Sequence, residues 1–119
     1  MFIYQATVEK VVDGDTLDLQ VDLGFGVLTR QRVRLLGINA PEHNTPEGKK
    51  AVAFVQKWVK EHGPTFAVRT MKDKKEKYGR YLATILSDTE ELGQALVDAG
   101  LAAPWGGSGV RPVPAAPDG

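Results

Sequence analysis

The stretch VVDGDTLDLQVDL, residues 11–23, decides the fold of this 119-residue chain. From Thr16 onward polar and apolar residues alternate strictly, as expected for a β-strand with one buried face. Just before this strand, Asp13-Gly14 is a dipeptide that favours a tight hairpin turn. The stretch therefore predicts the second strand of an antiparallel hairpin, and its apolar face is Leu17, Leu19, Val21 and Leu23.

The hairpin is expected to extend into a meander of three strands. The first strand covers about residues 2–12, and the GFG sequence at 24–26 marks a second turn. A third strand follows over about residues 27–36. Because side chains alternate along a strand, one face of it carries Arg30, Arg32 and Arg34.

A helix is predicted to begin at residues 45–47, Thr-Pro-Glu, because a capping hydroxyl, an early proline and an acid favour helix starts. Apolar residues then recur every three or four positions. Trp58 belongs to this stripe and is expected in the core, and Gly63-Pro64 ends the helix. The remaining elements are expected as strands over about 66–71 and 78–86, and a helix that follows 88–91.

The predicted order is three strands, a helix, two strands and a helix. Five strands with a helix inserted after the third fit an OB-type barrel of the α+β, mainly β class, with two to three helices. An open α+β sheet is the alternative, because the sequence does not show whether the sheet closes.

Composition predicts one globular domain, since 42% of the residues are hydrophobic and 25% are charged. We expect this domain over residues 1–105 and a flexible Gly/Pro-rich tail over 106–119. The chain lacks cysteine, which excludes disulfides and thiolate chemistry. No apolar run is long enough to span a bilayer, and the first residues do not resemble a secretory signal. We expect an intracellular monomer without a membrane partner.

Charge is unevenly distributed although the net charge is zero. The balance is −4 over residues 1–22, +8 over 23–80 and −4 over 81–119. Such asymmetry is typical of a nucleic-acid-binding surface, although a basic stretch is equally compatible with a solvated loop.

Three short motifs carry candidate chemistry. The turn at 13–16, DGDT, places two carboxylates where a hard cation finds oxygen ligands, although for this motif alone a plain Asp-Gly turn is the more common explanation. The stretch at 34–42, RLLGINAPE, combines an arginine suited to phosphate with a glutamate able to position water. The stretch at 77–81, KYGRY, offers cations and aromatic rings for phosphates and bases, or simply a β-turn.

Together these motifs, with ALVDAGLA at 95–102, resemble the staphylococcal nuclease (thermonuclease-like) family over about residues 4–105. The resemblance implies a five-stranded OB-type barrel. It also implies Ca²⁺-dependent hydrolysis of DNA and RNA that leaves 5′-hydroxyl and 3′-phosphate ends.

The resemblance also implies roles for individual residues. Asp15 is the expected metal carboxylate, with Asp13 a supporting acid behind it. Glu42 is expected to activate or orient the attacking water. The pair that clamps the phosphate would be Arg34 and Arg80. Three further implied roles are metal ligation by the Ala40 carbonyl and substrate contacts by Lys77 and Tyr78.

Asn39 departs from the family pattern, because it stands where the second metal carboxylate is expected. An amide oxygen still ligates Ca²⁺ but brings no charge, so we expect weak metal binding. A nucleic-acid-binding module without catalysis is therefore the alternative function, and a protein-interaction domain with a relic motif is a third. His43 and His62 are assigned no metal role from the sequence.

Overall fold

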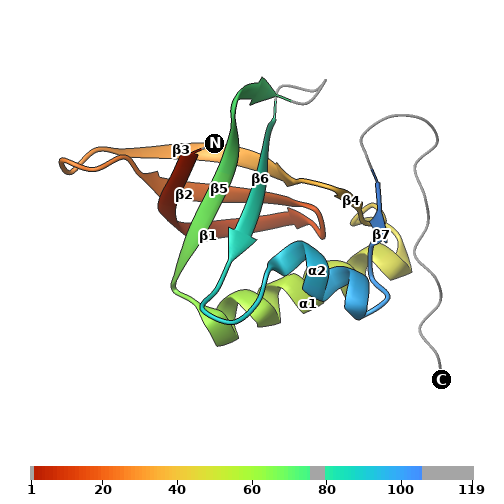
Figure 1. Ribbon diagram of the computed structural model, residues 1–119. Helices are drawn as coiled ribbons and strands as arrows, with labels where there is room; N and C mark the ends of the chain where they lie inside the picture. Colours follow the sequence, from red (N-terminus) through yellow and green to blue (C-terminus); the bar gives the residue numbers. More distant parts are fainter. Residues whose placement is uncertain (1, 76–79, 106–119) are drawn as a thin grey trace.

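The computed structural model describes residues 2–75 and 80–105 and shows a barrel with helices at one end (Figure 1). Five strands close in the order β1-β2-β3-β6-β5, and a separate two-stranded sheet joins β4 to β7. The elements in chain order are β1 (Phe2–Asp13), β2 (Thr16–Asp22), β3 (Leu28–Leu35), β4 (Ile38–Asn39), α1 (Pro46–His62), β5 (Thr65–Lys75), β6 (Tyr81–Leu86), α2 (Leu92–Asp98) and β7 (Ala103–Pro104). The closed barrel confirms the OB-type prediction over the open sheet.

One short parallel ladder closes the barrel. The other four strand pairs are antiparallel, whereas β3 and β6 run parallel and pair only through residues 33–35 and 81–83. The rest of β3, residues 28–32, pairs with β2 but not with β6. Among the described residues, β3 and β6 are therefore joined by a short ladder only.

The core fills the barrel and continues beneath the helices. Its barrel part includes Leu17 and Leu35, and α1 adds the buried side chains of Val55 and Trp58. Trp58 stacks on Phe66 with ring centroids 5.2 Å apart, and its Nε1 donates to Glu90 Oε1 at 2.7 Å. This confirms that Trp58 is a core residue.

The β2–β3 hairpin departs from the simple alternation of β2. Leu23 was expected on the buried face, but it is 47% exposed because it lies beyond the end of β2, in the turn. Phe25 is fully exposed and has a positive φ of 54°, flanked by glycines at 24 and 26 with φ of 81° and 75°. Figure 1 shows this hairpin projecting away from the barrel, on the side opposite β4 and β7.

Two element boundaries also differ from expectation. β5 extends to Lys75 rather than ending near residue 71, and β6 begins at Tyr81 rather than at residue 78. The expected flexible tail, 106–119, lies outside the described residues. Within the described part of the chain, none of the helices is both long and apolar enough to cross a membrane.

Candidate active site

The β1–β2 turn packs tightly against α1 because its central residue is glycine. A Cβ on Gly14 would lie 2.7 Å from Ala51 Cβ of α1 and 3.0 Å from Ala40 Cβ. Neither approach is compatible with normal packing, so a larger residue at Gly14 would displace the turn. The contact carries Asp15 inward, where only 6% of the residue is exposed.

Three groups surround the buried Asp15 carboxylate. Its Oδ2 accepts from the backbone N–H of Ala40 at 2.9 Å and lies 3.5 Å from Nη2 of Arg34. Its Oδ1 accepts from the hydroxyl of Thr16 at 3.1 Å. These contacts provide the compensation that a buried charge needs.

Arg34 is held inside the protein, with 4% of the residue exposed. Its Nη2 donates to the carbonyl oxygen of Ile38 at 2.9 Å and to Oδ1 of Asn39 at 3.4 Å. The guanidinium carbon lies 4.9 Å from the ring centroid of Trp105, and the backbone N–H of Trp105 donates to the carbonyl oxygen of Gly37 at 2.8 Å. Trp105 therefore covers Arg34 through a cation–π contact.

Arg80 approaches the same turn from the start of β6. Its Nη1 donates to Thr16 Oγ1 at 3.1 Å, so Thr16 joins Arg80 to Asp15. Two arginines that are far apart in sequence thus converge on consecutive residues of the turn. Thr16 is only 1% exposed. No role was predicted for Thr16, although it belongs to the DGDT motif.

A second polar group lies at the entrance to the turn. Asp13 Oδ1 accepts from the backbone N–H of His43 at 2.8 Å, and the ring Nδ1 of His43 lies 2.8 Å from the same oxygen. Together with Glu42, these residues bring one ligand atom each within 4.8 Å of one another. The contact of His43 with Asp13 was not predicted, since nothing in the sequence joins it to a residue 30 positions earlier.

The position of Glu42 is fixed by the first turn of α1. Its carbonyl oxygen accepts from both the backbone N–H (3.0 Å) and the hydroxyl (2.7 Å) of Thr45. The same hydroxyl caps α1 by accepting from Gly48 N at 3.0 Å, which confirms the predicted cap. A Cβ on Gly48 would overlap the carbonyl of Glu42. The side chain of Glu42 is left at an exposed position.

The residues fit a hard divalent cation in the type of donor atom. Asp15 and Asn39 offer oxygens inside the site, and Asp13 and Glu42 offer carboxylates at its entrance. The inner pair carries one formal negative charge, and Arg34 contacts both of its members. The two predicted substrate-contact residues, Lys77 and Tyr78, lie outside the described residues.

Comparison with known proteins identifies relatives of this chain. The family model described as staphylococcal nuclease homologue matches residues 32–106. The thermonuclease of Staphylococcus intermedius is 37% identical over 103 residues, covering 80% of this chain and 56% of that protein. Endonuclease YhcR of Bacillus subtilis is 31% identical over 97 residues, covering 72% of this chain but 8% of that protein.

A third relative, the uncharacterized protein MJ1439 of Methanocaldococcus jannaschii, is 35% identical over 104 residues, which cover 69% of this chain and 48% of that protein. The chain thus spans about half the length of two of these relatives and a small part of the third. The family match covers more than half of this chain and includes Arg34, Asn39, Glu42 and Arg80. With its closed five-stranded barrel, this chain belongs to the staphylococcal nuclease family.

Proposed function

We propose that this domain is a nuclease that hydrolyses phosphodiester bonds of DNA and RNA with Ca²⁺ and leaves 5′-hydroxyl and 3′-phosphate ends. One observation carries the proposal: Arg34 and Arg80 converge on Asp15 and Thr16, beside the group that contains Glu42. Fixed positive charge next to an accessible carboxylate suits phosphodiester hydrolysis, because negative charge develops on the phosphoryl oxygens in the transition state. The names of two relatives, an endonuclease and a thermonuclease, support the same activity.

Three side chains perform the chemistry in this proposal. Glu42 is exposed, so water can reach it, and it positions or deprotonates the water that attacks phosphorus. Arg80 is partly exposed and binds a phosphate oxygen, for which a guanidinium provides a planar set of donors. Arg34 acts from beneath Trp105, where its charge offsets the developing negative charge of the phosphate.

Binding groups complete the proposed site. Lys77 and Tyr78 contact the substrate beside its terminal phosphate, as the family resemblance implies. Asp15, Asn39 and the carbonyl of Ala40 hold the cation. When bound, the cation stabilises negative charge on the phosphate as a Lewis acid. Because Asn39 adds no charge and Arg34 lies 3.5 Å from Asp15, we expect weak Ca²⁺ binding.

A binding module that does not cleave is the second candidate function. The observation in its favour is again the inner pair, where the single negative charge of Asp15 already faces the positive charge of Arg34. In that case the domain binds single strands, with an affinity that falls steeply as salt concentration rises. The domain acts as a monomer in both proposals.

Cleavage of end-labelled single-stranded DNA and RNA, measured across Ca²⁺ concentrations up to the millimolar range, tests the proposal. We expect cleavage that EDTA abolishes and products with 3′-phosphate ends. Asn39→Asp should shift the Ca²⁺ dependence to lower concentration, because it adds a charged ligand. Strand binding without cleavage in Ca²⁺, Mg²⁺ or Mn²⁺ would contradict the nuclease and support the binding module.

A further inference from the structure

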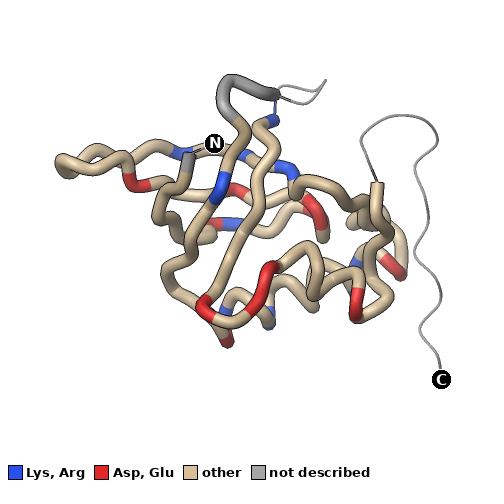
Figure 2. Tube along the Cα trace, viewed as in Figure 1, with Lys and Arg blue, Asp and Glu red and all other residues tan. Residues whose placement is uncertain are grey.

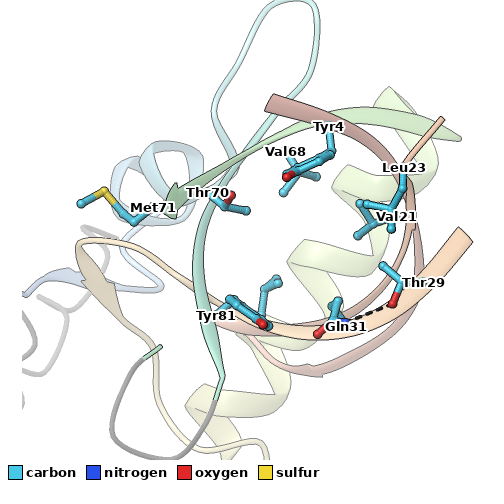
Figure 3. Close-up of a pocket in the computed structure, with 10 residues that line it drawn as sticks. Tyr4, Val21, Leu23, Thr29, Gln31, Val68, Thr70, Met71 and Tyr81 are labelled. Atoms are coloured by element: carbon cyan, nitrogen blue, oxygen red, sulfur yellow. Dashed lines mark hydrogen bonds between the residues drawn. The ribbon is translucent and has the colours of Figure 1, made fainter. Parts of the chain in front are cut away.

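The end of the barrel away from α1 opens into a cavity of about 350 Å³ (Figure 3). Its floor is apolar and is formed by Val21, Val33 and Val68, none more than 7% exposed. Tyr4 and Tyr81 lie on opposite sides of the opening. The cavity is large enough for a flat heterocyclic ring and lies within the usual size range of small-molecule pockets.

The described residues at the rim of the cavity include polar side chains. Among the described residues, the ten that line the cavity include no acidic or basic side chain. Gln31 uses one amide hydrogen to bind Thr29 Oγ1 at 3.1 Å, which leaves its carbonyl oxygen and second amide hydrogen for a ligand. Thr70 adds a hydroxyl on the facing wall. An uncharged ring with hydrogen-bonding groups on its edge fits these described lining residues.

The cavity and the candidate active site lie on opposite faces of the same two strands. Val33 of the cavity floor pairs with Tyr81, and the next pair along the ladder is Arg34 with Leu82. Arg80 directly precedes Tyr81. Successive strand residues are about 3.3 Å apart and point to opposite faces, so the cavity is separated from the arginines by the thickness of one strand.

The first residue pair between β3 and β6 lies next to both the cavity and Arg80. Residues 28–32 of β3 have no partner in β6, because the ladder between these strands starts at the pair Val33–Tyr81. A ligand seated between Tyr4 and Tyr81 therefore lies beside the start of β6, which Arg80 directly precedes in the chain. Uncharged rings linked to phosphates are the chemistry of nucleotides.

We propose that the barrel mouth is a nucleobase-binding subsite, which holds one unpaired base of the substrate strand while its phosphate lies toward Arg80. This inference rests on the proposed function, since that function supplies the nucleic-acid strand. The base packs between Tyr4 and Tyr81 and on the valine floor, and its edge binds Gln31 and Thr70. An unpaired strand is required, because a base within a duplex is not free to enter the cavity.

The test is a titration of the ¹⁵N-labelled protein with thymidine, followed by NMR in EDTA so that no cleavage occurs. We expect saturable shifts at the backbone amides of the mouth, such as those of Gln31 and Thr70. Deoxyribose 5-phosphate should not shift these amides. If it does, or if hexanol binds there as tightly as thymidine, the proposal is wrong.

Two variants sharpen this test. Thr70→Phe fills the mouth and should weaken thymidine binding at least tenfold, since aromatic–base stacking alone contributes about 1–3 kcal/mol, or roughly 5- to 150-fold, in known sites. Thr84→Phe is the matched control, because Thr84 lies on β6 and does not line the cavity. Unchanged binding by a folded Thr70→Phe would overturn the proposal.

Gln31→Leu is the second variant in case Thr70→Phe does not fold. It keeps the side-chain size and removes the hydrogen-bonding edge, and it should weaken thymidine binding roughly fivefold to tenfold. Equal binding of thymidine by this variant and the wild type would contradict base recognition at the mouth. The readout is independent of nuclease activity: thymidine binding without cleavage would refute the proposed nuclease only, and cleavage without thymidine binding would refute this subsite only.

Discussion

One end of the β2–β3 pair buries polar residues, whereas the other end exposes apolar ones. At the β1–β2 turn, where β3 ends, the polar residues Asp15 and Arg34 are no more than 6% exposed. At the hairpin, Phe25 is fully exposed and Leu28 is 55% exposed. Both ends contravene the usual rule that apolar groups are buried and charges are solvated. Deviations of this kind concentrate at functional sites.

Charged residues are distributed over several elements of the barrel and its connections (Figure 2). Basic segments lie along β3 and β5, while acidic ones occur at the β1–β2 turn and on the connection from β6 to α2 (Figure 2). On the outer face of the barrel the arginines are paired, Arg32 with Asp18 at 2.7 Å and Arg30 with Glu9 at 3.2 Å. These exposed pairs contribute little to stability, whereas the buried pair of Asp15 and Arg34 is sensitive to the loss of either partner.

The largest stability effect is expected from Arg34→Met, which leaves the Asp15 carboxylate buried without its counter-charge. We expect the free energy of unfolding to fall by about 3–5 kcal/mol. Urea unfolding measures it. The double variant with Asp15→Asn should recover much of the loss, because no unpaired charge then remains. A single variant as stable as the wild type would contradict this account of the turn.

A smaller effect is expected from Gly48→Ala. Helix propensity alone would favour alanine by about 1 kcal/mol. The added Cβ overlaps the carbonyl of Glu42, however, so the loop must move, and overpacking of this kind typically costs about 1–3 kcal/mol. We expect a net loss of stability in urea unfolding and slower cleavage, because Glu42 is displaced. Ala53→Gly, at an exposed position of α1, should lose stability by propensity alone and keep its cleavage rate.

A weaker effect on stability is expected from the Asp18–Arg32 pair on the outer face of the barrel, and it depends on pH. The hydrogen bond from Arg32 lowers the pKa of Asp18 relative to the unfolded chain. The pair therefore stabilises the fold above the unfolded pKa of Asp18, and this contribution is lost as pH falls through the folded pKa. Asp18→Asn should remove about 0.2–1 kcal/mol at neutral pH and nothing at strongly acidic pH. Urea unfolding at several pH values measures the difference, and a loss that does not depend on pH would contradict it.

The smallest effect is expected at the hairpin tip. Phe25→Asn replaces an exposed ring by a residue that tolerates positive φ, and stability should change by no more than about 0.5 kcal/mol. Leu19→Ala on the adjacent β2 is the contrast, with an expected loss of about 2–5 kcal/mol because Leu19 is buried. Thermal or urea unfolding compares the two. A large loss from Phe25→Asn would show that the tip is part of the core.

The sequence predicted the barrel because its signals are local. Alternation in β2, the Thr45 cap of α1 and the turn at Gly14 each act over a few residues. The two-residue strands β4 and β7 are too short to leave a periodic pattern. Exposure of Leu23 depends on where the barrel ends, which alternation does not reveal.

The candidate site was only partly accessible to sequence reasoning. Motifs identified Asp15, Arg34 and Arg80, but not their burial or the hydrogen bond from Arg80 to Thr16. Trp105 covers Arg34 through a contact that joins residues about 70 positions apart. The barrel mouth likewise combines side chains from five strands, so no segment of the sequence carries its signature.

We infer that the β1–β2 turn serves catalysis together with its neighbours Glu42 and Arg80. Paired measurements of single-stranded DNA cleavage and urea unfolding test it in the wild type, Glu42→Gln and Arg80→Gln, with Arg30→Gln as the control for an exposed arginine. We predict that Glu42→Gln and Arg80→Gln each lose roughly 100- to 1,000-fold in cleavage while Glu42→Gln keeps wild-type stability. Cleavage by the wild type that persists unchanged in both variants would contradict the claim.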